Sequence, residues 1–363
     1  MTATHGLVIG KFYPPHAGHH HLVRVAAAQS ARLTVVVMAS AVESLSLADR
    51  VAWLREVHAD DARITVTGIV DDHPVDYEDD AVWRAHVALM LEAARGVTSA
   101  PVDVVFTSEP YGEELGRRLG ARHALVDLER SAHAVSGTAV RADPIAHWAR
   151  LAPCVRAHLG LRVVLVGAES TGKTTLAEDL AAALRARAAT HGAAYAETRW
   201  VPEAGRDVTL EKLAALGEGA DMSALVWETP DFVNVARRQA AMEDDAARHG
   251  GPVLVCDTDG FATGIWHERY VGARSAEVER LGTLAPAHLY LLTHPDDVPF
   301  VDDGVRDGEH IRQWMTERFV ARLNERTPHW AWLRGERGAR SQRALSLIDE
   351  ALSRVFRFAA PLG

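Results

Sequence analysis

Two glycine-containing loops, each placed between an apolar run and a segment with helical spacing, constrain the fold of this chain more than any other feature. The first covers residues 10–19, reads GKFYPPHAGH and follows an apolar run at residues 7–9. The second covers residues 167–174, reads GAESTGKT and follows a run at residues 162–166. A glycine loop between a strand and a helix presents backbone N–H groups and the positive end of the helix dipole to an anion. Two such loops predict two α/β domains, each with a phosphate site.

Apolar runs and amphipathic segments alternate along the chain, which indicates parallel sheets with helical crossovers. We expect a Rossmann-like domain over residues 1–158, followed by a P-loop domain over residues 159–363. The expected strands cover residues 7–9, 33–38, 64–66, 102–106, 123–128, 162–166, 253–255 and 288–293. The expected helices cover residues 18–31, 48–58, 81–94, 111–119, 146–158, 174–190, 311–323 and 341–358.

Composition limits the class of protein. Of the 363 residues, 48% are hydrophobic and 24% are charged, which is a balance typical of soluble globular chains. The formal net charge of -10 disfavours a nucleic-acid surface. The two cysteines, Cys154 and Cys256, provide no disulfide framework, so we expect a cytoplasmic protein. No secretory leader and no run of eighteen apolar residues is found, which predicts no membrane association. Whether the chain forms a homo-oligomer stays open.

The first loop has the residue types that phosphate chemistry needs. Gly10 and Gly18 allow close backbone approach, and Phe12 lies between them in the loop. His16 and His19 are three residues apart across a turn, so both rings can face one phosphate and donate hydrogen bonds to developing charge. Histidines ahead of an ordinary helix are the alternative, which the full ten-residue pattern disfavours.

Two further groups belong with this loop. Lys11 adds a cation, while the adjacent His20 and His21 are expected to be solvated or packing residues. Residues 136–141 read SGTAVR, in which Ser136, Gly137 and Thr138 open a helix and offer donors to phosphate. Arg141 lies one turn along and can reach the β- or γ-phosphate. Alone this segment would be a plain helix cap; paired with the histidine loop it predicts phosphate binding.

The second loop matches the Walker A pattern in full and follows a strand. Its backbone N–H groups are expected to surround the β-phosphate, Lys173 to reach the β- and γ-phosphates, and the Thr174 hydroxyl to ligate Mg²⁺. The nucleotide-binding residues expected here are Gly167, Ser170, Thr171, Gly172, Thr174 and Thr175.

Four charged residues complete the candidate site of the second half. Asp257 ends an apolar strand, as a Mg²⁺-orienting acid should, and Asp259 follows it; one of them is expected at the metal and the other at the acceptor hydroxyl, unless both cap a helix. Glu203 can accept the proton of the acceptor hydroxyl or bind a ribose, and a surface glutamate is the alternative. Arg306, in residues 302–306 (DDGVR), can close on the transferred phosphoryl group as part of a lid, and a solvated turn is the alternative.

The first loop together with SGTAVR resembles the nucleotidylyltransferase superfamily, and within it the nicotinamide mononucleotide adenylyltransferases. The resemblance implies that the substrate phosphate attacks the α-phosphorus of ATP directly, with Mg²⁺, and releases pyrophosphate. It assigns transition-state stabilisation to His16 and His19, and it assigns the ATP phosphates to Lys11, Ser136, Thr138 and Arg141. Class I aminoacyl-tRNA synthetases share the HxGH element, but the lysine loop that they pair with it does not occur here.

The segments GAESTGKT, WVPEAGR, DFVNVARRQ, CDTD and DDGVR resemble the ribosylnicotinamide kinase half of the bifunctional bacterial NadR family. The order of the two halves is also that of the family. The resemblance implies a kinase that phosphorylates nicotinamide riboside and an adenylyltransferase that joins the mononucleotide product (NMN) to AMP, giving NAD. ATP and Mg²⁺ are the implied cofactors, and the implied partners are small molecules.

Two alternative functions stay open, and the chain differs from some members of the family in one respect. Some family members carry an N-terminal helix-turn-helix domain, for which we find no room before the first strand, so the transcriptional role is not inferred. The same two reactions on another cofactor precursor are one rival, and a nucleotide sensor without turnover is another. The complete catalytic sets disfavour the sensor. Among the nine tryptophans, Trp83, Trp200 and Trp227 are candidates for stacking on nicotinamide, with core packing as the alternative.

Overall fold

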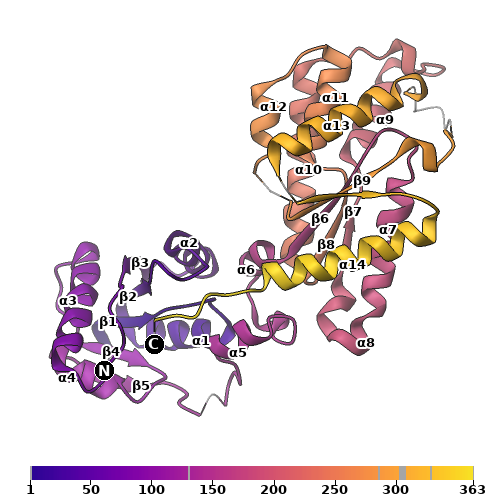
Figure 1. Cartoon of the computed structure of the whole chain (residues 1–363). Helices are drawn as coiled ribbons and strands as arrows, with labels where there is room; N and C mark the ends of the chain where they lie inside the picture. Colours follow the sequence, from indigo (N-terminus) through magenta and orange to yellow (C-terminus); the bar gives the residue numbers. More distant parts are fainter. Residues whose placement is uncertain (1, 130, 285–286, 302–307, 328, 363) are drawn as a thin grey trace. The chain divides into compact units, whose positions relative to one another are not determined.

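The computed structural model of the chain describes residues 2–129, 131–284, 287–301, 308–327 and 329–362. The chain forms two compact units: residues 1–155 with 356–363 make unit 1, and residues 156–355 make unit 2. Each unit contains one five-stranded sheet in which neighbouring strands are parallel (Figure 1). The predicted α/β class is therefore confirmed.

The sheet of unit 1 has the strand order β3-β2-β1-β4-β5. The order reverses between β1 and β4, and the crevice at such a reversal is where open parallel sheets bind ligands. In chain order, the elements are β1 (Ala3–Gly10), α1 (Ala17–Ala28), β2 (Ser30–Ala39), α2 (Leu47–Val57), β3 (Ile64–Val70), α3 (Asp80–Val97), β4 (Val104–Thr107), α4 (Gly112–Leu119), β5 (Arg122–Leu125), α5 (Gly137–Ala142), the 3₁₀ turn η1 (Trp148–Arg150) and α6 (Pro153–Leu159).

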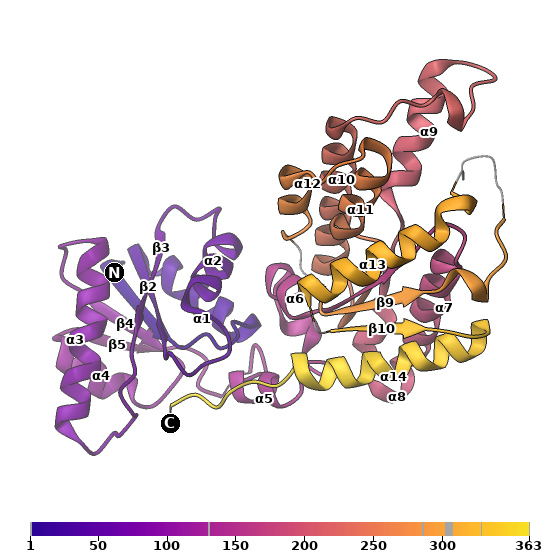
Figure 2. The same cartoon turned by 45° about the horizontal axis from the view of Figure 1, so that its top comes forward.

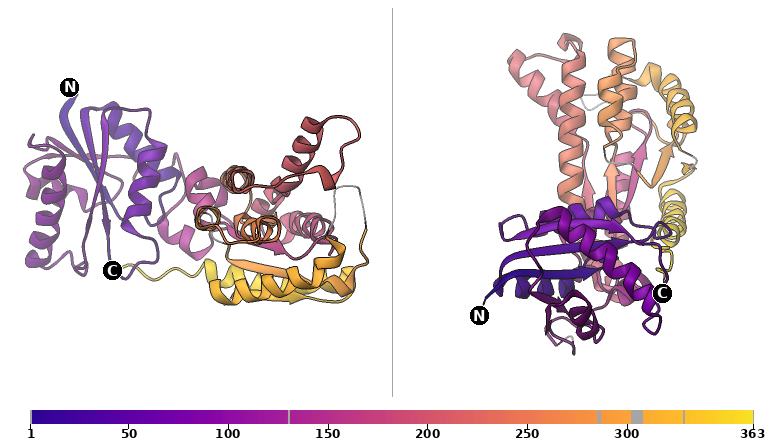
Figure 3. Two further views of the ribbon diagram at one scale, coloured as in Figure 1. Left: turned by 90° about the horizontal axis from the view of Figure 1, so that it is seen from above. Right: turned by 90° about the vertical axis from the view of Figure 1, so that its left-hand side faces the viewer.

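Helices cover both faces of this sheet, as Figure 3 (left) shows. Side chains alternate along a strand, so Val8 of β1 packs in the cluster that contains Val23 of α1 and Leu54 of α2. Its neighbour Leu7 packs in the opposite cluster, with Met90 of α3 and residues of α4. Because the central strand is covered on both faces, its apolar run is continuous rather than alternating.

The sheet of unit 2 has the strand order β10-β9-β6-β8-β7, with β6 in the centre. Its elements are β6 (Leu161–Val166), α7 (Lys173–Ala186), α8 (Ala188–His191), η2 (Ala193–Glu197), β7 (Arg199–Val201), α9 (Ala204–Leu216), η3 (Met222–Ala224), α10 (Thr229–His249), β8 (Val253–Asp257), α11 (Gly260–Val271), α12 (Ala276–Leu281), β9 (Leu289–Thr293), η4 (Pro295–Asp297), η5 (Glu309–Ile311), α13 (Arg312–Arg326), β10 (Trp330–Leu333) and α14 (Arg337–Val355).

Two helix layers also enclose the sheet of unit 2. Val164 of β6 packs in the cluster formed with Ile265 of α11 and Phe319 of α13. On the opposite face lie α7 and α14, and Figure 2 shows β9 and β10 between α13 and α14. The buried β6–α7 junction therefore places the second loop at the carboxyl end of the central strand.

Several features differ from the expectations. The expected helix 146–158 is divided into η1 and α6, because Pro153 lacks the N–H that a continuing helix needs and instead opens α6. The boundary between the units falls inside α6, after Val155, and residues from Phe356 onward group with unit 1. The prediction placed the boundary after residue 158 and put the C-terminal residues in the second domain. The short strand β10 and the helices α9, α10, α11 and α12 were not predicted. No helix in the described part of the chain is long and apolar enough to cross a bilayer.

Candidate functional site

A cavity of about 550 Å³ in unit 1 opens where β1 ends, which is within the range of small-molecule sites. Every residue that the sequence predicted for the first site lines it. These residues are Gly10, Lys11, Phe12, His16, Gly18, His19, Ser136, Gly137, Thr138 and Arg141.

The two histidines form a stacked pair at the start of α1. The ring centres of His16 and His19 are 3.7 Å apart, with an angle of 28° between the planes. The backbone N–H of His16 donates to His19 Nδ1 at 3.3 Å, which holds the His19 ring against the start of α1. Gly18 allows this arrangement, because a Cβ there would lie 3.3 Å from the His16 ring. The pair is therefore held in one orientation toward the cavity before any ligand arrives.

Two cations lie near the histidines. Arg141 Nη1 donates to the Tyr13 carbonyl at 2.7 Å, and its guanidinium carbon lies 5.0 Å from the centre of the Tyr13 ring. Lys11 Nζ lies 3.9 Å from Glu43 Oε1. Burial lowers the pKa of Lys11 below its ordinary value; Glu43 opposes this shift and the charge of Arg141 reinforces it. Two partly buried cations of this kind are stabilised by an anion between them.

The start of α5 supplies the remaining polar groups of this end. The Ser136 hydroxyl caps the helix by accepting from Ala139 N at 3.1 Å. Arg141 Nη2 donates to Thr138 Oγ1 at 3.2 Å, which holds both residues on one side of the cavity. A Cβ at Gly137 would lie 3.2 Å from Arg141 Nη1, so a larger residue would crowd the guanidinium.

Aromatic and acidic side chains also line this cavity. Tyr77 stacks on Tyr111 at 5.9 Å, and Trp83, which packing buries, donates its indole N–H to Tyr77 O at 3.0 Å. Asp71 accepts from the Nδ1 atoms of His73 and His86. Of these residues only Trp83 was named from the sequence, because no motif links the others to the loops.

The second loop encloses a cavity of about 310 Å³ in unit 2. Gly167 has φ 147°, and a Cβ there would lie 2.4 Å from Thr293 Oγ1, so only glycine fits. Gly172 has φ 81° and opens α7. Lys173 Nζ donates to Ala168 O at 2.9 Å within the loop. Of the residues predicted for this loop, the cavity is lined by Ser170, Thr171, Gly172, Lys173, Thr174 and Thr175.

The two predicted acids are separated. Asp257, at the end of β8, lines the cavity and accepts a hydrogen bond from the Thr174 hydroxyl. Asp259 points into the core instead: it caps α11 through Ala262 N at 3.0 Å and accepts from the Tyr290 hydroxyl at 2.7 Å. It does not line the cavity. Asp257 therefore lies in the cavity beside Thr174, whereas Asp259 caps α11 and lies outside the cavity lining.

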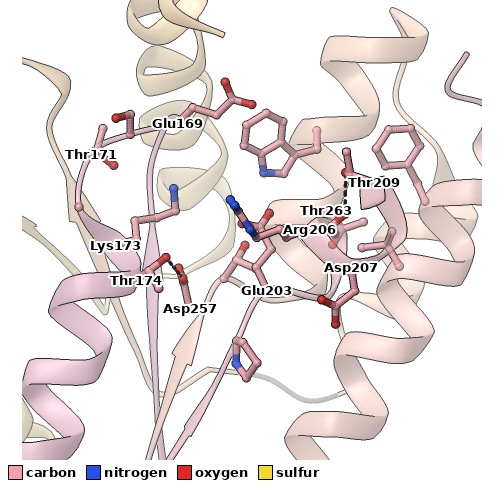
Figure 4. Close-up of a pocket in the computed structure, with 18 of the residues that line it drawn as sticks. Glu169, Thr171, Lys173, Thr174, Glu203, Arg206, Asp207, Thr209, Asp257 and Thr263 are labelled. Atoms are coloured by element: carbon pink, nitrogen blue, oxygen red, sulfur yellow. Dashed lines mark hydrogen bonds between the residues drawn. The ribbon is translucent and has the colours of Figure 1, made fainter. Parts of the chain in front are cut away.

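Glu203 lies at the N-terminal cap of α9 and lines the same cavity. Removal from water raises the pKa of its carboxyl group to about 7; Lys173 opposes this shift, and Asp257 and Glu169 reinforce it. Figure 4 shows Glu203 between the loop residues Lys173 and Thr174 and the far wall of the pocket. A carboxyl group with a pKa near neutrality in a cleft is a candidate general base.

The far wall of this cavity is built by residues that the motifs did not reveal. Trp227 packs against Tyr270 at 5.5 Å between ring centres, and both line the cavity together with Trp266. Arg206 extends into the pocket beside Glu203 (Figure 4). Of the tryptophans named from the sequence, Trp200 and Trp227 line this cavity and Trp83 lines the other. Arg306 and residues 302–307 lie outside the described part of the chain.

The fold and the two cavities define a two-unit α/β protein in which a glycine-containing strand–loop–helix segment lines a cavity in each unit. A family model described as an AAA domain matches residues 162–340. The trifunctional NAD biosynthesis/regulator protein NadR of Escherichia coli (strain K12) is 26% identical over 320 residues, which cover 84% of this chain and 72% of that protein. The NadR of Salmonella typhimurium is also 26% identical, over 83% of this chain and 71% of that protein.

Solved structures have the same fold. A crystal structure of NadR in complex with NR covers 97% of both chains with a TM-score of 0.69 and 22% identity. A second, of NadR with NAD and AMP-PNP, covers 97% of this chain and 96% of that chain with a TM-score of 0.67 and 21% identity. The chain is therefore homologous to NadR proteins, which confirms the resemblance carried by its motifs.

Proposed function

We propose that the chain is a bifunctional enzyme of NAD biosynthesis. Unit 2, as a P-loop kinase domain, transfers the γ-phosphoryl group of ATP to the 5′-hydroxyl of nicotinamide riboside and yields NMN and ADP. Unit 1, as a Rossmann-like nucleotidylyltransferase domain, transfers AMP from a second ATP to the phosphate of NMN and yields NAD and pyrophosphate. The product of unit 2 is the substrate of unit 1.

One observation carries the proposal: in each cavity the residues predicted to bind phosphate occur together with several aromatic side chains. A phosphate site alone would fit any nucleotide-binding protein. Aromatic lining residues fit an acceptor with a flat ring, which stacks on aromatic side chains. The names of the solved NadR complexes support the ligand classes, since they contain NR, NAD and the ATP analogue AMP-PNP.

In unit 1, catalysis rests on positioning and charge stabilisation. The phosphate of NMN attacks the α-phosphorus of ATP, and the bond from that phosphorus to the bridging oxygen breaks, releasing pyrophosphate. The stacked His16 and His19 rings donate hydrogen bonds to charge that develops on the phosphate oxygens. Lys11 and Arg141 hold the leaving phosphates. No residue of the chain forms a covalent intermediate.

In unit 2, the loop amides and Lys173 hold the triphosphate, and Glu203 accepts the proton of the 5′-hydroxyl. The oxygen ligands that Mg²⁺ prefers are present, since the Thr174 hydroxyl contacts the Asp257 carboxylate. These two residues would hold the ion, which supplies charge neutralisation on the β- and γ-phosphates when bound. Arg206, which extends into the pocket beside Glu203, is placed to meet the acceptor or the phosphates.

Trp227 is the residue that we assign to the nicotinamide ring in unit 2. Within the described residues its indole N–H is buried without a hydrogen-bond partner. A buried donor of this kind costs free energy unless a ligand satisfies it. The positively charged pyridinium ring of the riboside is attracted to the face of an indole.

The direct test is to incubate the purified protein with nicotinamide riboside, ATP and Mg²⁺ and to separate the products by chromatography. NMN and then NAD are expected to accumulate, with ADP and pyrophosphate. Parallel reactions with other ribosides and with nicotinate mononucleotide distinguish the rival that acts on another precursor. Binding of ATP without any product would favour the rival that only senses nucleotides.

The raised pKa of Glu203 predicts a pH dependence of the kinase reaction. A general base must be deprotonated to act, so kcat/KM for riboside phosphorylation should rise about tenfold per pH unit below pH 7. It should level off above pH 7, because the pKa of the carboxyl group is about 7. The measurement is kcat/KM for the riboside at saturating MgATP across this range.

Glu203→Gln provides the control for this profile. The amide keeps the shape of the side chain but cannot accept the proton, so the rate should be low and nearly independent of pH. An unchanged acidic limb in Glu203→Gln would assign the titration to another group, such as the γ-phosphate of ATP. A flat profile in the parent protein would remove Glu203 from the role of base.

A further inference from the structure

The chain leaves the second unit after α14 and continues as an extended segment, residues 356–362, which belongs to unit 1 (Figure 1). Two aromatic contacts anchor it. Phe356 packs on Trp148 with ring centres 6.3 Å apart, and Phe358 packs edge-on against Tyr13 at 6.1 Å. Helical spacing in the sequence predicted a helix through Phe358, so the extended course is set by these contacts with unit 1.

Backbone groups of the 356–362 segment close a hydrogen-bond ring around Tyr13. The Tyr13 hydroxyl donates to Ala359 O at 3.0 Å and accepts from Ser44 N at 2.9 Å. The Ala359 N–H in turn donates to Ser44 Oγ at 2.7 Å. Tyr13 is 2% exposed, so its hydroxyl group depends on these partners rather than on water.

The same segment contacts the cations of the first cavity. Lys11 Nζ donates to Leu362 O, and Pro361 lines the cavity. Arg141 rests on Tyr13 through both the carbonyl and the ring, as described above. Each of the two cations assigned to the ATP phosphates is therefore in contact either with the segment or with the tyrosine that the segment holds.

We propose that the 356–362 segment is a positioning element of the adenylyl-transfer site, which holds Lys11 directly and Arg141 through Tyr13. The inference rests on the function proposed for unit 1. Lysine has three donors, so one can stay on the Leu362 carbonyl while the others meet phosphate. Held in this way, the cations lose little freedom when the transition state forms, which is the basis of electrostatic preorganisation. The segment that follows the last kinase helix thus completes the site of the other reaction.

The test is a chain that ends at Val355, assayed for NAD formation from supplied NMN and, separately, for riboside phosphorylation. Displacing groups that orient a substrate costs up to about 100-fold in rate. We expect kcat for adenylyl transfer to fall about 10- to 100-fold with the KM for ATP changed less than about twofold, as for an interaction made in the transition state. Riboside phosphorylation should stay at the level of the full chain.

Substitutions in the full chain separate positioning from folding. Tyr13→Phe removes only the hydroxyl group and should lower the same kcat in the same way. In the truncated chain it should cost less than in the full chain, because the partner at Ala359 is already gone. Arg357→Ala is the matched control: its side chain is exposed within the same segment, so adenylyl transfer should be unchanged.

Several outcomes would overturn the proposal. An unchanged kcat after truncation would make the segment a passive extension. A lower KM for ATP or a higher kcat would mean that it blocks the site instead of building it. If the truncated chain fails to fold, Tyr13→Phe and Ser44→Ala in the full chain decide: additive effects, or no effect, refute the proposal. Absence of adenylyl transfer in the full chain would instead refute the proposed function, and this is seen before any variant is made.

Discussion

Lys173→Ala is expected to abolish phosphorylation of nicotinamide riboside while leaving NAD formation from supplied NMN intact. The Lys173 amine donates to Ala168 O within the loop, and the lysine of such a loop is expected to meet the β- and γ-phosphates. Alanine leaves the developing charge without this donor, and the loop amides alone do not replace it. A loss of about 10³-fold or more in kcat is expected, at or above the upper end for one oriented donor.

The measurement uses two separate assays on one preparation, so each activity serves as the control for the other. Lys11→Ala is the matched variant: it makes the same change in the other cavity and should reverse the pattern, reducing adenylyl transfer and sparing the kinase. A parallel fall of both activities in folded Lys173→Ala protein would contradict the assignment of one reaction to each unit.

The strand–loop–helix units could be predicted because their determinants are local. Gly167 and Gly172 have positive φ angles, which the loop itself requires. The apolar runs that precede both loops form the central strands β1 and β6. The residues predicted to bind phosphate therefore line the cavities. Gly167 is the exception: it lies beneath the loop against Thr293 rather than on the surface of the cavity.

The choice between Asp257 and Asp259 depends on contacts that no local pattern carries. Asp257 ends β8 and Asp259 follows two residues later, and both suit a metal or a helix cap. Tyr290 makes the difference: it lies on β9, which β6 separates from β8 in the sheet, and its hydroxyl group meets Asp259 in the core. The aromatic lining of both cavities was predicted only in part for the same reason: Trp83, Trp200 and Trp227 were named from the sequence, whereas Tyr77 and Tyr270, on segments far from either loop, were missed.

The end of α14 shows a further limit of periodicity. Apolar residues continue at helical spacing through Phe358, yet the helix ends at Val355. Ala359 finds its hydrogen-bond partners in Ser44 and Tyr13, more than 300 positions earlier in the sequence. Hydrogen bonds to such distant partners replace the helical hydrogen bonds that the backbone would otherwise make. The spacing of apolar residues in the sequence gives no sign of these distant partners.

His19→Ala is expected to lower kcat for adenylyl transfer by about 10²–10³-fold, the typical cost of removing one oriented donor to a transition state. The His19 imidazole stacks on the His16 ring, and its Nδ1 accepts from the backbone N–H of His16, so it is already oriented before ATP binds. Because the donor meets charge that develops only as the α-phosphate reacts, the KM for ATP should change little. The kinase activity of the same preparation should be unchanged.

His20→Ala is the control variant for His19→Ala, because it removes the next histidine of α1. His20 follows directly along α1, but it is 4% exposed, contacts His58 Nε2 at 3.1 Å through its own Nδ1 and does not line the cavity. Its loss should lower Tm and leave kcat of the folded protein near the parent value, since its role is packing. A raised KM for ATP with kcat intact in His19→Ala would reassign that imidazole to uniform substrate binding. Equal losses of kcat in both variants would mean that disruption of α1, rather than a donor to the phosphate, accounts for the effect.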